Sequence, residues 1–199
     1  MKFIIRLFSA LIITFSYIEL AYSKTTKIII FGDSLIAGYG LVVEDNFVNQ
    51  LKLKTIENKI NDVTLFNSGV SGETSTGLLN RYKWVLEDNY DGVIILIGAN
   101  DALRGIDPSL TSQNIEKILS YLKEKQIPTM LIGMKAPNNL GEIYVNEFNT
   151  IYPRLSKKYN AAYYPFFLKD VALKPSLNQR DMIHPNTKGV KIIVKNFFP

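Results

Sequence analysis

Short apolar runs alternate with longer amphipathic stretches along this chain, and the alternation predicts its secondary structure. The runs are four or five residues long and rich in β-branched residues or tyrosine, which is typical of buried strands. Between them, apolar residues recur at the spacing of helices that cover one face of a sheet. The expected strands are residues 27–31, 63–67, 93–97, 129–133 and 161–164. The expected helices are residues 46–58, 74–86, 111–125, 143–158 and 187–196.

Repeated strand–helix units indicate parallel strands joined by right-handed crossovers, with helices on both faces of the sheet. The pattern therefore predicts the α/β class: a three-layer α/β/α sandwich around a flavodoxin-like, parallel, five-stranded sheet. We see no internal repeat, low-complexity linker or shift in composition along the chain. Residues 24–199 are accordingly expected to form a single domain.

Residues that can take part in catalysis follow the expected strands. Ser34 follows the first strand, Gly72 the second and Asn100 the third, while Asp181 and His184 precede the last helix. Functional sites of such sheets lie at the carboxyl ends of the strands. We therefore expect all five residues at one edge of the sheet.

Ser34, His184 and Asp181 are the residue types of a serine hydrolase. A serine hydroxyl needs a base to take its proton, and His184 is the only histidine in the chain. Asp181, three residues earlier, can fold back and hold the imidazole in its productive tautomer. The alternative is a histidine that is merely satisfied in the core or caps a helix. A metal site is not expected, because the chain has one histidine and no cysteine.

Three groups can stabilise the oxyanion that forms when a serine attacks a carbonyl. They are the backbone N–H of Ser34 at a strand-to-helix turn, the backbone N–H of Gly72 and the side-chain amide of Asn100. Taken singly, a glycine or an asparagine after a strand is explained by turn chemistry. Together with a nucleophile and a base, the three are better explained as donors. Three charged residues nearby are interpreted first as structural hydrogen-bonding groups: Asp33, Asp101 and Arg104.

Four sequence blocks resemble those of the SGNH (GDSL-type) hydrolases. They are Gly32-Asp33-Ser34-Leu35, Gly72, Gly98-Ala99-Asn100-Asp101 and Asp181-Met182-Ile183-His184-Pro185-Asn186. The resemblance extends over nearly the whole chain after residue 23 and is closest to the exported bacterial branch of acyl-CoA thioesterases, lysophospholipases and arylesterases. It implies the SGNH hydrolase fold, Ser34 as nucleophile, Asp181 and His184 as its partners, and Ser34, Gly72 and Asn100 as oxyanion donors. It also implies that the loop 136–143 is a mobile flap over the acyl group.

The first 23 residues read as a secretory signal peptide. A short basic start is followed by a mostly apolar run and by small residues at the −3 and −1 positions of a cleavage site, Ala21 and Ser23. Four polar residues interrupt the run, so a membrane anchor is the weaker interpretation. We expect cleavage before Lys24, a periplasmic or secreted product, and no stable membrane anchor after cleavage. The lysines are scattered rather than clustered, so the net charge of +5 does not indicate a nucleic-acid partner.

The sequence thus predicts an enzyme that cleaves esters and thioesters of lipophilic acyl groups without a metal or cofactor, as a monomer. One alternative is a carbohydrate O-acetylesterase on the same fold. Another, of a different class, is a non-catalytic lipid-binding protein. Apolar residues in loops near the site favour a lipophilic substrate and are predicted to line its pocket: Leu103, Ile106, Pro137, Leu140 and Ile143.

Overall fold

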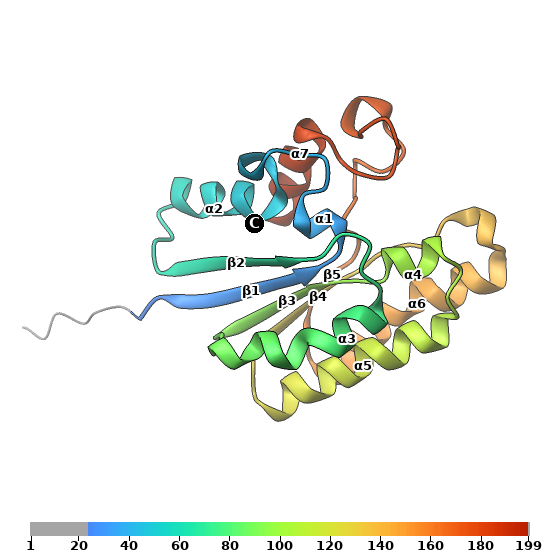
Figure 1. Cartoon of the computed structure of the whole chain (residues 1–199), viewed down its shortest axis with the longest axis horizontal. Helices are drawn as coiled ribbons and strands as arrows, with labels where there is room; N and C mark the ends of the chain where they lie inside the picture. Colours follow the sequence, from blue (N-terminus) through green and yellow to red (C-terminus); the bar gives the residue numbers. More distant parts are fainter. Residues whose placement is uncertain (1–23, 199) are drawn as a thin grey trace, which may run out of the picture.

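A computed structural model describes residues 24–198 and has a parallel five-stranded sheet at its centre (Figure 1). The strand order is β2-β1-β3-β4-β5, and every neighbouring pair is parallel. This is the predicted α/β class with the flavodoxin-like order of strands. The strands are β1 (Thr26–Gly32), β2 (Val63–Gly69), β3 (Gly92–Leu96), β4 (Thr129–Ile132) and β5 (Ala162–Tyr164).

Helices cover both faces of this sheet and complete three layers. In Figure 1, α1, α2 and α7 lie on one face, and α3, α5 and α6 lie on the other, with the short α4 beside the strand ends. The bounds are α1 (Ser34–Ala37), α2 (Phe47–Glu57), α3 (Ser75–Val85), α4 (Ala99–Leu103), α5 (Pro108–Glu124), α6 (Glu142–Tyr159) and α7 (Thr187–Phe197).

The central strands are buried on both sides because helices pack on each face. All five residues of β3 are buried, as are the last four residues of β1, which pairs with it. This explains why both strands read as continuous apolar runs rather than as alternating patterns. The core thus fixes the direction in which β1 and β3 deliver the residues that follow them.

The predicted elements are all present, with ends shifted by a few residues. The largest shift is at α5, which begins at Pro108 rather than at residue 111. Asp107 caps this helix by accepting a hydrogen bond from the Ser109 N–H, and proline suits the first helical position. The strand-to-helix turn expected at Ser34 opens the short helix α1, whose bounds were not predicted, and the short helix α4 was not predicted at all; each follows a central strand.

The predicted signal peptide lies outside the described residues. Within residues 24–198, no helix is both long and apolar enough to cross a membrane. Over the same range, no cluster of three or more carboxylate or imidazole side chains is arranged to hold a metal ion.

Candidate active site

The direction in which the strands are added reverses between β1 and β3. From β1 the chain moves outward to β2, crosses back to β3, and then continues to β4 and β5 on the other side. A crevice forms at the carboxyl ends of strands where the order reverses in this way. Ser34 follows β1 and Asn100 follows β3, so both residues lie at this crevice.

Ser34 is held at the start of α1 by the residue before it. The Asp33 carboxylate caps the helix by accepting a hydrogen bond from the Leu35 N–H at 2.9 Å. Gly38 ends the helix after four residues with φ of 83°, a left-handed conformation that glycine adopts without strain. Ser34 is therefore fixed in a tight strand-to-helix turn.

A chain of hydrogen bonds joins Ser34, His184 and Asp181. The Ser34 Oγ lies 2.9 Å from Nε2 of His184, and Nδ1 of the same ring lies 2.7 Å from Oδ2 of Asp181. With Nδ1 protonated and donating to the carboxylate, Nε2 is left to accept the serine proton. The arrangement can activate a serine hydroxyl.

Asp181 is held in place by its own loop. Its Oδ1 accepts hydrogen bonds from the backbone N–H groups of Ile183 and His184, at 2.9 and 3.0 Å. Partial burial alone would raise the pKa of Asp181, but the hydrogen bonds from His184 and Ile183 outweigh it and lower that pKa to about 2. Asp181 is therefore a carboxylate at any pH where an esterase works.

Two further residues support His184 and were missed by sequence reasoning. The Tyr39 ring centroid lies 4.7 Å from that of the imidazole. Gln179 donates from Nε2 to the Tyr39 carbonyl at 2.7 Å, while its backbone N–H donates to the His184 carbonyl at 2.8 Å. These contacts tie the histidine loop to the segment after α1.

Gly72 and Asn100 are linked through Glu73. The side-chain amide of Asn100 donates from Nδ2 to the Glu73 carbonyl at 3.0 Å, and Gly72 precedes Glu73 in the chain with φ of 79°. An amide nitrogen carries two hydrogens, so one bond to Glu73 leaves a second hydrogen for a ligand. The structure thus brings both predicted donors to the edge that carries Ser34.

The three charged neighbours make structural hydrogen bonds, as expected. Asp33 caps α1, while Arg104 donates from Nη2 to the Gly72 carbonyl at 2.7 Å. Asp101 is fully buried and accepts hydrogen bonds from the Ser75 N–H at 2.8 Å and from the Thr111 hydroxyl at 3.1 Å. It therefore joins the start of α3 to α4 and α5.

A cavity of about 600 Å³ opens beside the serine and the imidazole. Its walls come mainly from α4, from the segment after β4 and from the loop before α7. Side chains that line it include Leu35, Ala102, Leu103, Met134, Ala136, Pro137, Phe166, Leu168, Met182 and Ile183, together with Ser34, Asn100 and His184.

The lining of the cavity overlaps with the predicted pocket in part. Leu103 and Pro137 line it, but the other three predicted residues are not part of its lining. Ile143 is 78% exposed at the start of α6, Leu140 packs against the core, and the Ile106 carbonyl accepts a hydrogen bond from the Tyr144 hydroxyl. The five residues were chosen because they lie in loops near the site. Their position in the sequence does not show which way each side chain faces.

Comparisons with known proteins show which family this chain is similar to. Residues 30–192 match the GDSL-like Lipase/Acylhydrolase family. The chain is 33% identical over 186 residues to an arylesterase of Vibrio mimicus, covering 93% of this chain and 92% of that protein. It is 36% identical over 160 residues to thioesterase 1/protease 1/lysophospholipase L1 of Escherichia coli K12, covering 80% of this chain and 75% of the relative.

Solved structures of esterases are also similar. AlinE4, an SGNH-hydrolase family esterase, shares 41% identity with a TM-score of 0.76, covering 87% of this chain and 93% of that one. The psychrotrophic esterase EstA from Pseudoalteromonas sp. shares 34% identity with a TM-score of 0.82, covering 87% of this chain and 94% of that one.

Proposed function

This chain belongs to the GDSL-like lipase/acylhydrolase family and is a serine esterase of the SGNH type, and on that premise we propose that Ser34 carries its chemistry. The proposed reaction is hydrolysis of carboxylic esters and thioesters of lipophilic acyl groups through an acyl-enzyme. The hydrogen-bonded chain from Ser34 through His184 to Asp181 is the observation that carries the proposal.

In the first step, Ser34 Oγ attacks the substrate carbonyl carbon and His184 Nε2 accepts the serine proton. The imidazolium then gives that proton to the leaving alcohol or thiol as the carbon–oxygen or carbon–sulfur bond breaks. A water molecule then attacks the acyl-enzyme and loses a proton to His184; the bond between the acyl carbon and Ser34 Oγ breaks, His184 returns the proton to Ser34, and the acid is released. The Asp181 carboxylate stabilises the imidazolium in both steps and stays unprotonated throughout, because its pKa is lowered to about 2.

Preorganised hydrogen-bond donors stabilise the negative charge that develops on the substrate carbonyl oxygen. We assign this role to the backbone N–H groups of Ser34 and Gly72 and to Nδ2 of Asn100. Such donors favour the tetrahedral intermediate over the ground state because the charge develops only there.

The lining of the cavity supports a lipophilic acyl group. Apolar side chains such as Leu103, Met134 and Phe166 make up most of its surface beside Ser34. Binding an acyl chain there removes apolar surface from water, which is favourable by about 25 cal/mol per Å². Polar side chains also line the cavity, among them Lys135, Asn138, Asn139 and Asn178. Apolar atoms nevertheless make up most of its surface, which favours an acyl chain over the sugar of a carbohydrate O-acetylesterase substrate.

Replacing Ser34 by alanine tests the proposed nucleophile. Ser34→Ala should lose nearly all hydrolysis of p-nitrophenyl butyrate and all labelling by a fluorophosphonate probe, because no oxygen remains to attack. EstA, whose structure is described as inhibited by monoethylphosphonate, indicates that phosphonates suit this kind of site. Ser109→Ala, at an exposed serine of α5, should behave as the wild type. Undiminished hydrolysis by Ser34→Ala would refute the assignment.

A chain-length series tests the acyl group. The specificity constant kcat/KM for p-nitrophenyl esters should rise from acetate toward longer acyl chains, because each added methylene enters the apolar cavity. Activity confined to the acetate would favour the O-acetylesterase alternative. A folded protein that binds fatty acids yet leaves the fluorophosphonate unreacted would favour the lipid-binding alternative.

We further propose that the enzyme is exported after cleavage before Lys24 and acts as a periplasmic monomer without a stable membrane anchor. N-terminal sequencing of the protein from the periplasmic fraction and light scattering of the purified enzyme test both points. A chain that begins at Met1 in the cytoplasm would contradict export.

A further inference from the structure

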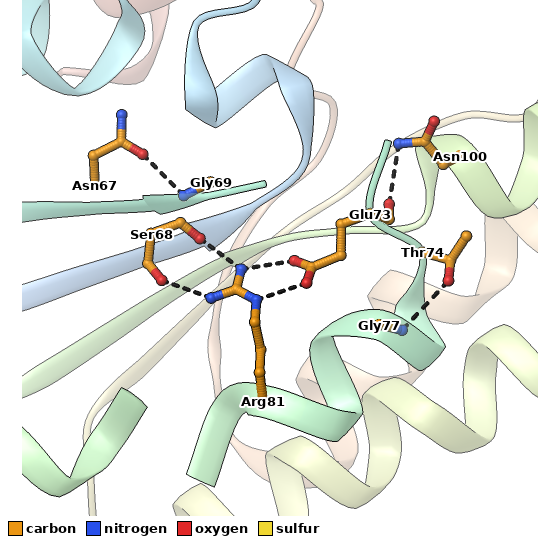
Figure 2. Close-up of polar contacts among 8 residues, drawn as sticks. All are labelled: Asn67, Ser68, Gly69, Glu73, Thr74, Gly77, Arg81 and Asn100. Atoms are coloured by element: carbon orange, nitrogen blue, oxygen red, sulfur yellow. Dashed lines mark hydrogen bonds and ion pairs between the residues drawn. The ribbon is translucent and has the colours of Figure 1, made fainter. Parts of the chain in front are cut away.

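One side chain holds both ends of the loop that carries Gly72. Figure 2 shows Arg81, on α3, reaching back to Ser68 at the end of β2 and to Glu73 just before the helix. Its Nη1 donates to the Ser68 hydroxyl and its Nη2 to the Ser68 carbonyl, each at 2.7 Å. Its Nε and Nη2 donate to the two carboxylate oxygens of Glu73, at 2.6 and 2.7 Å. One guanidinium thus joins the two sides of the loop 70–72.

We call the contacts of Arg81 with Ser68 and Glu73 the Arg81 clamp. The ion pair between Arg81 and Glu73 within it is largely shielded from solvent. The side chain of Glu73 is 5% exposed and that of Arg81 is 20% exposed. The guanidinium also lies 5.3 Å from the ring centroid of Phe31, on the strand that leads to Ser34. A planar guanidinium that grips a carboxylate with two bonds fixes orientation as well as distance, which an exposed lysine would not do.

The fold leaves room for this arrangement at Gly77. A Cβ at that position would lie 2.9 Å from the Cγ of Glu73, so a larger residue would push the glutamate away from Arg81. The first turn of α3 is therefore shaped around the ion pair.

Glu73 connects the clamp to the proposed oxyanion donors. Its carboxylate is held by Arg81, while its carbonyl accepts the hydrogen bond from Nδ2 of Asn100. Both anchors are on Glu73, the residue that directly follows Gly72 in the chain. A displacement of Glu73 would therefore break the hydrogen bond from Asn100 and disturb the adjoining Gly72, whose carbonyl is also held by Arg104.

We propose that Arg81 and Glu73 are positioning residues for ester hydrolysis, which hold Gly72 and Asn100 where the oxyanion forms. The inference rests on the proposed function of the site. Neither residue touches the reacting atoms. Their contribution belongs to the transition state, since the donors they orient matter most when the charge develops.

The competing explanation is that the ion pair only stabilises the fold. Removing one charge leaves its partner buried without compensation, whereas removing both with apolar residues of similar size is often nearly neutral for stability. A comparison of single and double variants therefore separates stability from positioning.

The test uses the variants Arg81→Met, Arg81→Lys, Glu73→Gln and the double variant Glu73→Met/Arg81→Met. Arg81→Met should lower kcat about 10- to 100-fold with little change in KM. Arg81→Lys should cause a smaller loss, because the ammonium keeps the positive charge but cannot form the two parallel bonds of the guanidinium. In the double variant the melting temperature should recover toward that of the wild type while kcat stays low. Recovery of kcat together with the melting temperature would overturn the proposal.

Coupling to Asn100 provides a second readout. If Arg81 acts through Asn100, the loss of kcat caused by Arg81→Met should shrink at least about fivefold when Asn100→Ala is already present. Equal losses in both backgrounds would also overturn the proposal. If Arg81→Met does not fold, Arg81→Lys and Glu73→Gln decide the outcome by the same comparisons.

Two controls complete the design. Lys158→Met removes a surface ion pair with Glu116, between α6 and α5, and should leave kcat unchanged. Ser34→Ala keeps the two proposals apart. If Ser34→Ala is inactive while the Arg81 variants match the wild type, positioning fails and the proposed function stands. If Ser34→Ala stays active, the proposed function itself fails.

Discussion

Asp33 adjoins the proposed nucleophile in the chain, yet it is fully buried. One carboxylate oxygen caps α1, whereas Oδ2 has no hydrogen-bond partner among residues 24–198. Burial raises the pKa of Asp33 to about 6, although the Leu35 N–H and the charge of His184 act in the opposite direction. The residue is thus a source of pH-dependent stability close to the nucleophile.

Asp33→Asn should flatten this pH dependence. Between the ordinary pKa of 3.8 and the folded value of about 6, the native state keeps a proton that the unfolded chain has lost. The free energy of unfolding of the wild type therefore falls as the pH rises through this range, by up to about 3 kcal/mol from this residue. Asparagine cannot ionise, and its Oδ1 can still cap α1.

Urea titrations at pH 4 and pH 7 measure the effect, as the difference between variant and wild type. Asp181 does not interfere, because its lowered pKa reduces stability only as the pH falls below about 4. An identical pH dependence in the variant would contradict the pKa of about 6.

At this scale, the sequence predicts what local spacing and strand order determine. Asp181 and His184 are three residues apart, so their contact follows from one turn of chain. Gln179 and Tyr39 are 140 positions apart, and no pattern in the sequence announces that they meet. The Arg81 clamp was also missed, because the path of the loop 70–72 decides which residues Arg81 meets.

Among the helices, length separates those whose bounds were predicted from those whose bounds were not. The five long helices carry enough residues for a periodic pattern, and the strands were recognised as short apolar runs. Helices α1 and α4, with four and five residues, are too short for one, yet they carry Ser34 and Asn100. The elements that present the site are thus the ones that periodicity cannot detect.

The cap of α7 has a second task that follows from its place beside the histidine. Asn186 accepts hydrogen bonds from the N–H groups of Lys188 and Gly189, and its amide donates to the carbonyls of Ser176 and Asn178. It therefore joins the helix to the loop that holds His184.

Asn186→Ala should lower both stability and activity. Loss of the cap should cost about 1 kcal/mol or more, and loss of the two loop contacts should let His184 move, so kcat should fall as well. Asn46→Ala is the control for loss of a helix cap, because the Asn46 side chain caps α2 by accepting a hydrogen bond from the Asn49 N–H and makes no hydrogen bond to residues 165–186. Thermal melts and steady-state kinetics measure the pair. Equal kcat in the two variants would contradict the role of Asn186 in holding the histidine.

On the scale of the whole molecule, the proposed nucleophile and its base come from opposite ends of the chain, 150 positions apart. The base lies in residues 165–186, whose only regular structure is a short 3₁₀ turn, Pro175–Leu177, and one isolated bridge between Asn178 and Pro185. Segments with few regular hydrogen bonds open more readily than the core of a sheet.

Activity should therefore be lost at lower urea concentrations than secondary structure. The sheet and helices should keep their far-UV circular dichroism while residues 165–186 open and carry His184 away from Ser34. Residual ester hydrolysis and ellipticity are to be measured on the same samples across a urea series. Superimposable transitions would show that the base segment unfolds only with the whole domain.

Because His184 is the only histidine in the chain, all imidazole signals in an NMR spectrum of the protein come from this residue. Isotope-edited resonances of histidine would report one residue without any assignment effort, and that residue lies between Ser34 and Asp181. The neighbouring ring of Tyr39 makes those resonances sensitive to small displacements. Protonation, tautomer and inhibitor binding at this site can thus be followed in the unmodified protein by one pair of nitrogen signals.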